Sequence, residues 1–85
     1  METPLRFYVD YNDMFEEANG ETWVEIPPTL NTLLMNHLRS GLPIVVYDYD
    51  GLEFDAVAKF DERYQAWVGV PDWSTRRDLP PSHDK

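Results

Sequence analysis

The chain has 85 residues, of which 42% are hydrophobic and 14% aromatic, and it carries a formal net charge of −9 with no cysteine. This length allows one hydrophobic core, and the lack of cysteine excludes disulfides, thiolate metal sites and cysteine nucleophiles. The negative charge opposes direct nucleic-acid binding. No stretch is apolar enough for a signal peptide or a membrane span, so we expect a cytoplasmic protein that does not contact the membrane.

Two short strands are predicted in the first part of the chain. Residues 5–11 alternate between apolar and polar side chains, which is the two-residue period of a half-buried strand. The residues on its apolar face are Leu5, Phe7, Val9 and Tyr11. Segment 12–20 breaks the alternation with a single helical turn and ends in the turn signal Asn19-Gly20. A second strand follows at residues 22–26.

A packed helix is predicted next. Thr29 suits an N-cap, Gly41 suits the left-handed position after a helix, and Pro43 forbids continuation. The leucines at helical spacing are Leu30, Leu33, Leu34 and Leu38. His37 falls within this apolar stripe, and we expect it to be a core residue rather than a zinc ligand or a general base.

After Pro43 the pattern predicts a three-stranded antiparallel meander, with strands at residues 44–49, 52–60 and 65–70. Asp50-Gly51 favours a two-residue hairpin, and a four-residue turn is expected at 61–64. The pairs expected inside are Val45–Ala56, Tyr47–Phe54 and Tyr49–Leu52, with Trp67 opposite Ala58. The residues left on the other face are Ile44, Val46, Val57, Val68 and Val70. A slip of one residue would reverse the faces.

These elements together predict an α+β fold. The expected form is a small antiparallel sheet in the order β-β-α-β-β-β with one packed helix, and an SH3-like barrel is one closed version of it. Residues 1–77 are expected to form a single globular domain. Residues 78–85 contain two prolines and end in polar side chains, so a flexible C-terminal tail is expected there.

Acidic residues gather in two segments, with seven acids in residues 1–25 and six in residues 43–62. In the expected hairpin Asp48 lies opposite Glu53, and like charges facing each other destabilise a strand pair. The four acids of this hairpin are Asp48, Asp50, Glu53 and Asp55, and Glu16, Glu17 and Glu21 are possible additions. Either basic side chains of the same chain neutralise them or a basic partner does. The internal candidates are Lys59, Arg63, Arg76 and Arg77.

No metal, cofactor or catalytic site is predicted. The segment Asp48-Tyr49-Asp50-Gly51 has its glycine at the fourth position, whereas a calcium loop needs glycine at about the sixth position. The serines lie in no nucleophile-elbow context, and no phosphate loop or HExxH motif is present. We therefore expect a protein that is not an enzyme.

The segment containing Trp73, Arg76 and Arg77 has the composition of an interface hot spot. Two other interpretations remain open. Trp73 can pin this segment to the sheet while the arginines pair with the acidic hairpin. Alternatively, Trp23, Trp67 and Trp73 can line a groove for proline-rich peptides.

The favoured function is a protein-binding inhibitor or adaptor that presents its acidic hairpin to a basic protein. The predicted partner-binding residues are Asp48, Asp50, Glu53, Asp55, Trp73, Arg76 and Arg77. The alternative is an accessory subunit of a larger assembly that docks through Val46, Val57 and Val68. A third hypothesis, a small enzyme or ligand-binding protein, needs a pocket near His37 or the tryptophans. The sequence leaves the oligomeric state open.

Overall fold

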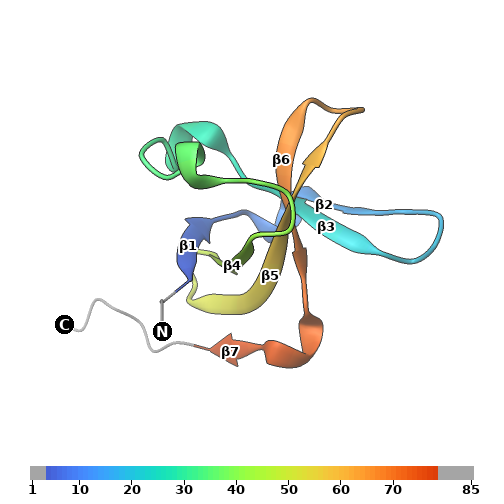
Figure 1. Ribbon diagram of the computed structural model, residues 1–85. Coiled ribbons are helices and arrows are strands. Elements are labelled where there is room, and N and C mark those ends of the chain that lie inside the picture. The colour runs from blue at the N-terminus through green and yellow to red at the C-terminus, as the bar shows by residue number, and fades with distance from the viewer. Residues whose placement is uncertain (1–3, 79–85) are drawn as a thin grey trace.

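A bent, mixed β-sheet dominates the computed structural model, which describes residues 4–78 (Figure 1). Its strands are β1 (Leu5–Tyr8), β2 (Met14–Glu16), β3 (Thr22–Glu25), β4 (Pro43–Tyr47), β5 (Leu52–Asp61), β6 (Ala66–Pro71) and β7 (Arg77–Asp78). Their spatial order is β1-β4-β5-β6-β3-β2, and β7 pairs with β5. Strand β1 runs parallel to β4 and the other pairs are antiparallel. The predicted all-antiparallel sheet is therefore wrong.

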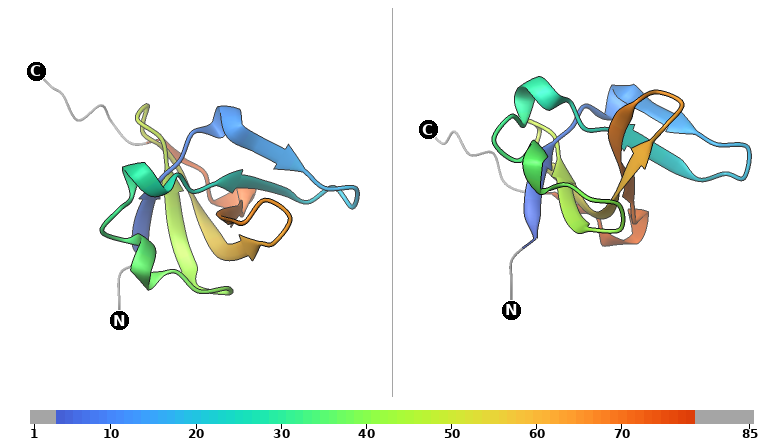
Figure 2. Two further views of the ribbon diagram at one scale, coloured as in Figure 1. Left: turned by 90° about the horizontal axis from the view of Figure 1, so that it is seen from above. Right: turned by 45° about the horizontal axis from the view of Figure 1, so that its top comes forward.

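The predicted α+β class is also wrong, because residues 4–78 contain no helix of seven or more residues. The segment between β3 and β4 instead forms two isolated 3-10 turns, η2 (Pro28–Leu30) and η3 (Met35–His37), seen in Figure 2. Two more turns, η1 (Tyr11–Asp13) and η4 (Trp73–Thr75), follow β1 and β6. The sheet is open, so the SH3-like barrel is not formed.

The conformation of Asn31 explains why the predicted helix does not form. Its buried side chain bonds to the backbone of Tyr8, and its own backbone lies at φ −131° and ψ 31°, outside the helical region. A side chain that bonds elsewhere competes with helical backbone pairing, and a helix this short is marginal alone. Leu30 and Leu33 are consequently 61% and 88% exposed. His37 is exposed as well, so the prediction that it is a core residue is wrong.

The β4–β5 hairpin has a three-residue loop rather than the predicted two-residue turn. The Asp48 N–H donates to the Leu52 carbonyl at 3.1 Å, and Gly51 adopts φ +90°, a conformation that favours glycine. The extra residue shifts the register by one, so that Tyr47 rather than Asp48 lies opposite Glu53. The predicted inward pairs of this hairpin are therefore wrong. The inward pairs are Ile44–Ala56 and Val46–Phe54.

The β5–β6 connection has the predicted length of four residues, but it lies one residue later, at 62–65. Trp67 therefore lies opposite Phe60, and Gly69 takes the predicted place of Trp67 opposite Ala58. Because the shift is by two positions, the faces are preserved. A Cβ atom on Gly69 would lie 3.0 Å from Cγ1 of Val46, so this crowded position favours glycine.

The core lies on the inner face of the bent sheet. Its buried residues are Phe7, Val9, Val24, Ile26, Leu38, Ile44, Val46, Phe54, Ala56 and Ala58. The predicted inner face of β5 is confirmed, and so is the apolar face of residues 5–11, although β1 itself ends at Tyr8. Val46 and Val68, which were expected on the outer face, are fully buried.

Asp78, the first residue of the predicted tail, belongs to β7, and residues 79–85 lie outside the described part of the chain. Among residues 4–78, no helix has the length and apolar character needed to cross a membrane.

Candidate interaction surface

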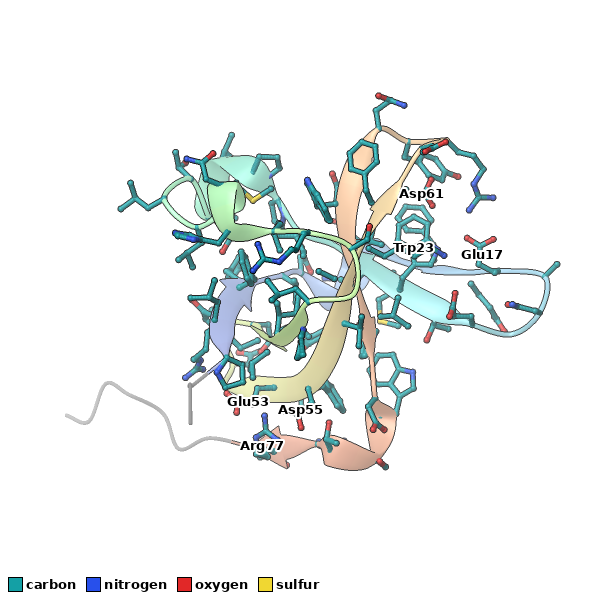
Figure 3. The ribbon with its side chains drawn as sticks, in the orientation of Figure 1. Glu17, Trp23, Glu53, Asp55, Asp61 and Arg77 are labelled. Atoms are coloured by element: carbon teal, nitrogen blue, oxygen red, sulfur yellow. The ribbon has the colours of Figure 1, made fainter. Side chains whose placement is uncertain are left out.

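The acids of the predicted hairpin divide between two environments. Glu53 and Asp55 lie on the outer face of β5, beside the C-terminal segment (Figure 3). Asp48 and Asp50 belong to the β4–β5 loop. Only the first pair is neutralised by ion pairs among the described residues.

Glu53 and Asp55 are neutralised within the chain. The Arg77 guanidinium donates to Glu53 at 2.7 Å and to Asp55 at 2.8 Å. Arg6 Nη2 adds an ion pair 2.8 Å from Glu53 Oε1, without the geometry of a hydrogen bond. The bonds to Asp55 and Glu53 raise the pKa of Arg77. Glu53, only 7% exposed, is therefore a structural residue of the outer face.

The other predicted residues of the C-terminal segment also make internal contacts. Trp73 is 43% exposed, and its ring and that of Phe54 pack edge to face with centroids 4.7 Å apart. Its indole N–H donates to Thr22 Oγ1 at 2.9 Å. Arg76 pairs with Asp78 at 3.3 Å. These contacts agree with a segment pinned to the sheet.

The tryptophan groove does not form in residues 4–78, because Trp23 is buried and Trp67 packs on Phe60. The apolar sheet face proposed for an accessory subunit is reduced as well. Of its three valines, only Val57 is exposed, at 46%.

Asp10 follows β1, and Asp48 and Asp50 follow β4, so the three acids belong to the same end of the sheet. Because β1 and β4 are parallel with Tyr8 opposite Tyr47, the residues that follow the two strands emerge side by side. Partial burial raises the pKa of the Tyr8 hydroxyl, and so do the negative charges of its neighbours Asp10, Tyr49, Asp48 and Asp50. We call Asp10, Asp48 and Asp50 the Tyr8 carboxylate cluster. Both acidic segments of the sequence thus contribute to this end of the sheet.

Two members of the cluster also stabilise turns. Asp10 accepts from the N–H of Asn12 at 2.9 Å, and Asp48 accepts from the N–H groups of Asp50 and Leu52, both at 3.1 Å. These bonds need a side-chain oxygen that asparagine also supplies, so turn formation does not require the negative charge. None of the ion pairs within residues 4–78 involves the three carboxylates.

A second ion-pair network joins the β2–β3 hairpin to the β5–β6 turn, well separated from Glu53 in Figure 3. Glu17 accepts from the Trp23 indole at 2.7 Å and from Arg63, which also bonds to Asp61. The bonds from Trp23 and then Arg63 lower the pKa of Glu17. Burial alone would raise the pKa of Asp61, but its bonds to Arg63 and to backbone N–H groups lower it overall.

Aromatic rings cover this second network. Phe15 stacks on Trp23 with centroids 4.5 Å apart, and the ring centroid of Tyr64 lies 5.7 Å from that of Trp23.

Of the additional acids predicted, Glu17 is paired in this network and Glu21 lies 3.8 Å from Lys59, so only Glu16 has no ion pair among the described residues. The network that joins Glu17 to Arg63 was not predicted, and no local sequence signal marks it, because the two residues are 46 positions apart.

No three acidic or histidine side chains within residues 4–78 are grouped so as to hold a metal ion. The chain matches no protein-family model, no curated protein and no solved structure.

Proposed function

We propose that this domain is a small protein-binding module, of the inhibitor or adaptor type, that presents the Tyr8 carboxylate cluster to a basic protein. It acts by binding rather than by catalysis. The observation that carries the proposal is that Asp10, Asp48 and Asp50 follow the paired strands β1 and β4 at one end of the sheet and take part in no ion pair among residues 4–78. We place the activity in the cytoplasm, which the absence of cysteine favours.

The acids of the cluster differ from the other acids in whether their charge is neutralised by an ion pair. Glu53, Asp55, Glu17 and Asp61 are held by arginines. In the cluster, by contrast, the charge is not needed for the turns and is not neutralised by an ion pair within residues 4–78. A basic partner supplies the counter-charge on binding. The exposed ring of Tyr49, 83% accessible, lies beside the cluster and offers an aromatic contact of the kind that dominates interface energetics.

The proposed mechanism is occlusion of a positively charged surface on the partner. Negative charge gathered in one place steers a basic protein toward that place and raises the association rate, while mismatched partners are repelled. Binding of this kind weakens as salt concentration rises, because exposed charges are screened.

The test compares two variants with the same net charge. In the first, Asp48→Asn with Asp50→Asn removes two cluster charges, while the side-chain amide oxygen introduced at position 48 preserves the loop hydrogen bonds. In the second, Glu16→Gln with Glu62→Gln removes two exposed charges elsewhere. Each tagged protein is used to capture partners from native lysate, which are released by stepped salt and identified by mass spectrometry.

We expect one basic protein to elute from the wild type and from the Glu16/Glu62 variant, and to be absent from the Asp48/Asp50 variant. Equal capture by both variants would show that the cluster is not the binding site. A complex that resists high salt would contradict an electrostatic contact.

A further inference from the structure

Two strongly exposed leucines line a depression near the end of the sheet that carries the cluster. Leu30 in η2 is 61% exposed and Leu33, just after it, is 88% exposed. Single exposed leucines are common on protein surfaces, but these two overhang the same depression. The depression has a volume of about 430 Å³ and lies between residues 29–34 and the outer face of β1 and β4.

The outer-face side of this depression is formed by Arg6 and Tyr47. The Arg6 guanidinium lies 4.7 Å from the centre of the Tyr47 ring and pairs with Glu53. Its charge is therefore already compensated, and it does not oppose a positively charged ligand as a free arginine would. A ligand in the depression would therefore contact the leucine side chains, the Tyr47 ring and the flat guanidinium of Arg6.

The depression and the carboxylate cluster are adjacent. Tyr47 packs edge to face on Tyr8 at 5.9 Å, and Tyr8 is bonded through its backbone to Asn31, which also lines the depression. Tyr47 lines the depression and is followed directly by Asp48, and Asp10 comes two residues after Tyr8, the partner of Tyr47 in the sheet. An apolar hollow therefore shares a border with negative charge that no ion pair within residues 4–78 neutralises.

We propose that this depression binds apolar side chains of the basic partner, so that the ligand is a basic segment with hydrophobic side chains on one side. Charge complementarity selects this occupant: an anionic lipid surface or a second copy of a chain of charge −9 would be repelled by the cluster. The inference rests on the proposed function, because the cluster supplies the electrostatic half of the contact.

The experiment uses two synthetic peptides of equal charge and length. One carries lysines with leucines spaced along a single helical face, and in the other serines replace the leucines. Binding to the full chain is measured by fluorescence anisotropy. The protein variants are Leu30→Ser with Leu33→Ser, Asp48→Asn with Asp50→Asn, and, as a control, Asn36→Ala, an exposed residue of η3 that does not line the depression.

We expect the leucine peptide to bind about tenfold or more tighter than the serine peptide, since burying one leucine side chain supports at least that change. The Leu30/Leu33 variant should lose this advantage and keep the weaker binding of the serine peptide, while Asn36→Ala should keep both. Equal affinity of the two peptides, or an advantage that survives the leucine substitutions, would overturn the inference and leave the proposed function intact.

Loss of all peptide binding in the Asp48/Asp50 variant supports the cluster as the electrostatic half of the site. If neither peptide binds the wild type, the proposed function fails and the inference fails with it. Self-association of the wild type that disappears in the Leu30/Leu33 variant, measured by analytical ultracentrifugation, would assign the depression to a second copy and overturn the inference.

Discussion

Asn31 pairs with Tyr8 as a neighbouring strand would. Its side-chain oxygen accepts the Tyr8 N–H at 2.8 Å and its side-chain nitrogen donates to the Tyr8 carbonyl at 3.0 Å. The same nitrogen donates to the Pro27 carbonyl at 2.9 Å. Because β1 is an edge strand, this contact covers backbone groups that would otherwise be open to another chain. It also ties residues 27–31 to the sheet.

Asn31→Ala is therefore expected to destabilise the fold. The substitution leaves the Tyr8 backbone groups without partners in a partly buried site, which typically costs about 1–3 kcal/mol in the free energy of unfolding. Urea denaturation measures the loss. Asn36→Ala, at an exposed position in η3, is the control and should unfold near the wild-type midpoint.

Asn31→Asp distinguishes the contribution of the side-chain oxygen, which accepts a hydrogen bond, from that of the side-chain nitrogen, which donates. Aspartate keeps the acceptor for the Tyr8 N–H but cannot donate to the two carbonyls when ionised. It should therefore be as unstable as Asn31→Ala or more so. Wild-type stability in either variant would contradict the role assigned to Asn31.

Local pattern predicted five of the seven strands, missed β2 and β7, and predicted the connections poorly. The alternation in residues 5–11 and in β5 identified the core faces correctly, because burial on one side of a sheet imposes a two-residue period. The β4–β5 register depended on whether the loop contains two or three residues. Asp48, by bonding to two N–H groups of that loop, supports the longer form. The leucine spacing of residues 30–38 was outweighed by one distant contact, that of Asn31 with Tyr8.

The candidate surface was predictable only in part. Asp48 and Asp50 were identified from the turn sequence, but Asp10 joins them through the parallel pairing of β1 with β4, which no local pattern indicates. Glu53 and Asp55 were grouped with the predicted site because the sequence does not show which acids Arg77 contacts. Arg77 and Glu53 are 24 positions apart, so no local pattern indicates that they pair.

Arg77 is expected to matter for stability far more than its neighbour Arg76. Arg77→Gln removes the bonds to Glu53 and Asp55 and leaves the buried Glu53 carboxylate with Arg6 as its one remaining ion-pair partner in residues 4–78. An incompletely compensated buried charge is destabilising. Arg76→Gln removes only the exposed pair with Asp78, and such pairs contribute little.

Thermal unfolding of the two variants tests this difference. A clearly lower Tm for Arg77→Gln, with a near wild-type Tm for Arg76→Gln, is the expected result. Peptide binding by a folded Arg77→Gln protein should be unchanged, since Arg77 belongs to the ion-pair network rather than to the carboxylate cluster. Equal Tm values would show that the network does not stabilise the fold, and lost binding would return Arg77 to the interaction surface.

The Glu17–Arg63–Asp61 network predicts loss of stability in acid. The folded-state pKa values of Glu17 and Asp61 lie below their ordinary values of 4.5 and 3.8. For a carboxyl group whose pKa is lowered by folding, the stabilisation is fully present above the unfolded-state pKa and is lost as pH falls through the folded-state pKa. Wild-type stability should therefore decline progressively below pH 4.5.

Glu17→Gln tests how much of that decline comes from this one group. Glutamine keeps an oxygen that can accept from the Trp23 indole but loses the charge that pairs with Arg63. The variant should be less stable than the wild type at neutral pH, and the difference should shrink as the wild-type carboxyl becomes protonated. Urea midpoints measured from neutral to acidic pH give both curves. Glu16→Gln removes the neighbouring charge, which has no ion pair among residues 4–78, and should follow the wild-type curve. A constant gap between Glu17→Gln and the wild type at every pH would mean that lost packing, rather than the lost charge of Glu17, accounts for the effect.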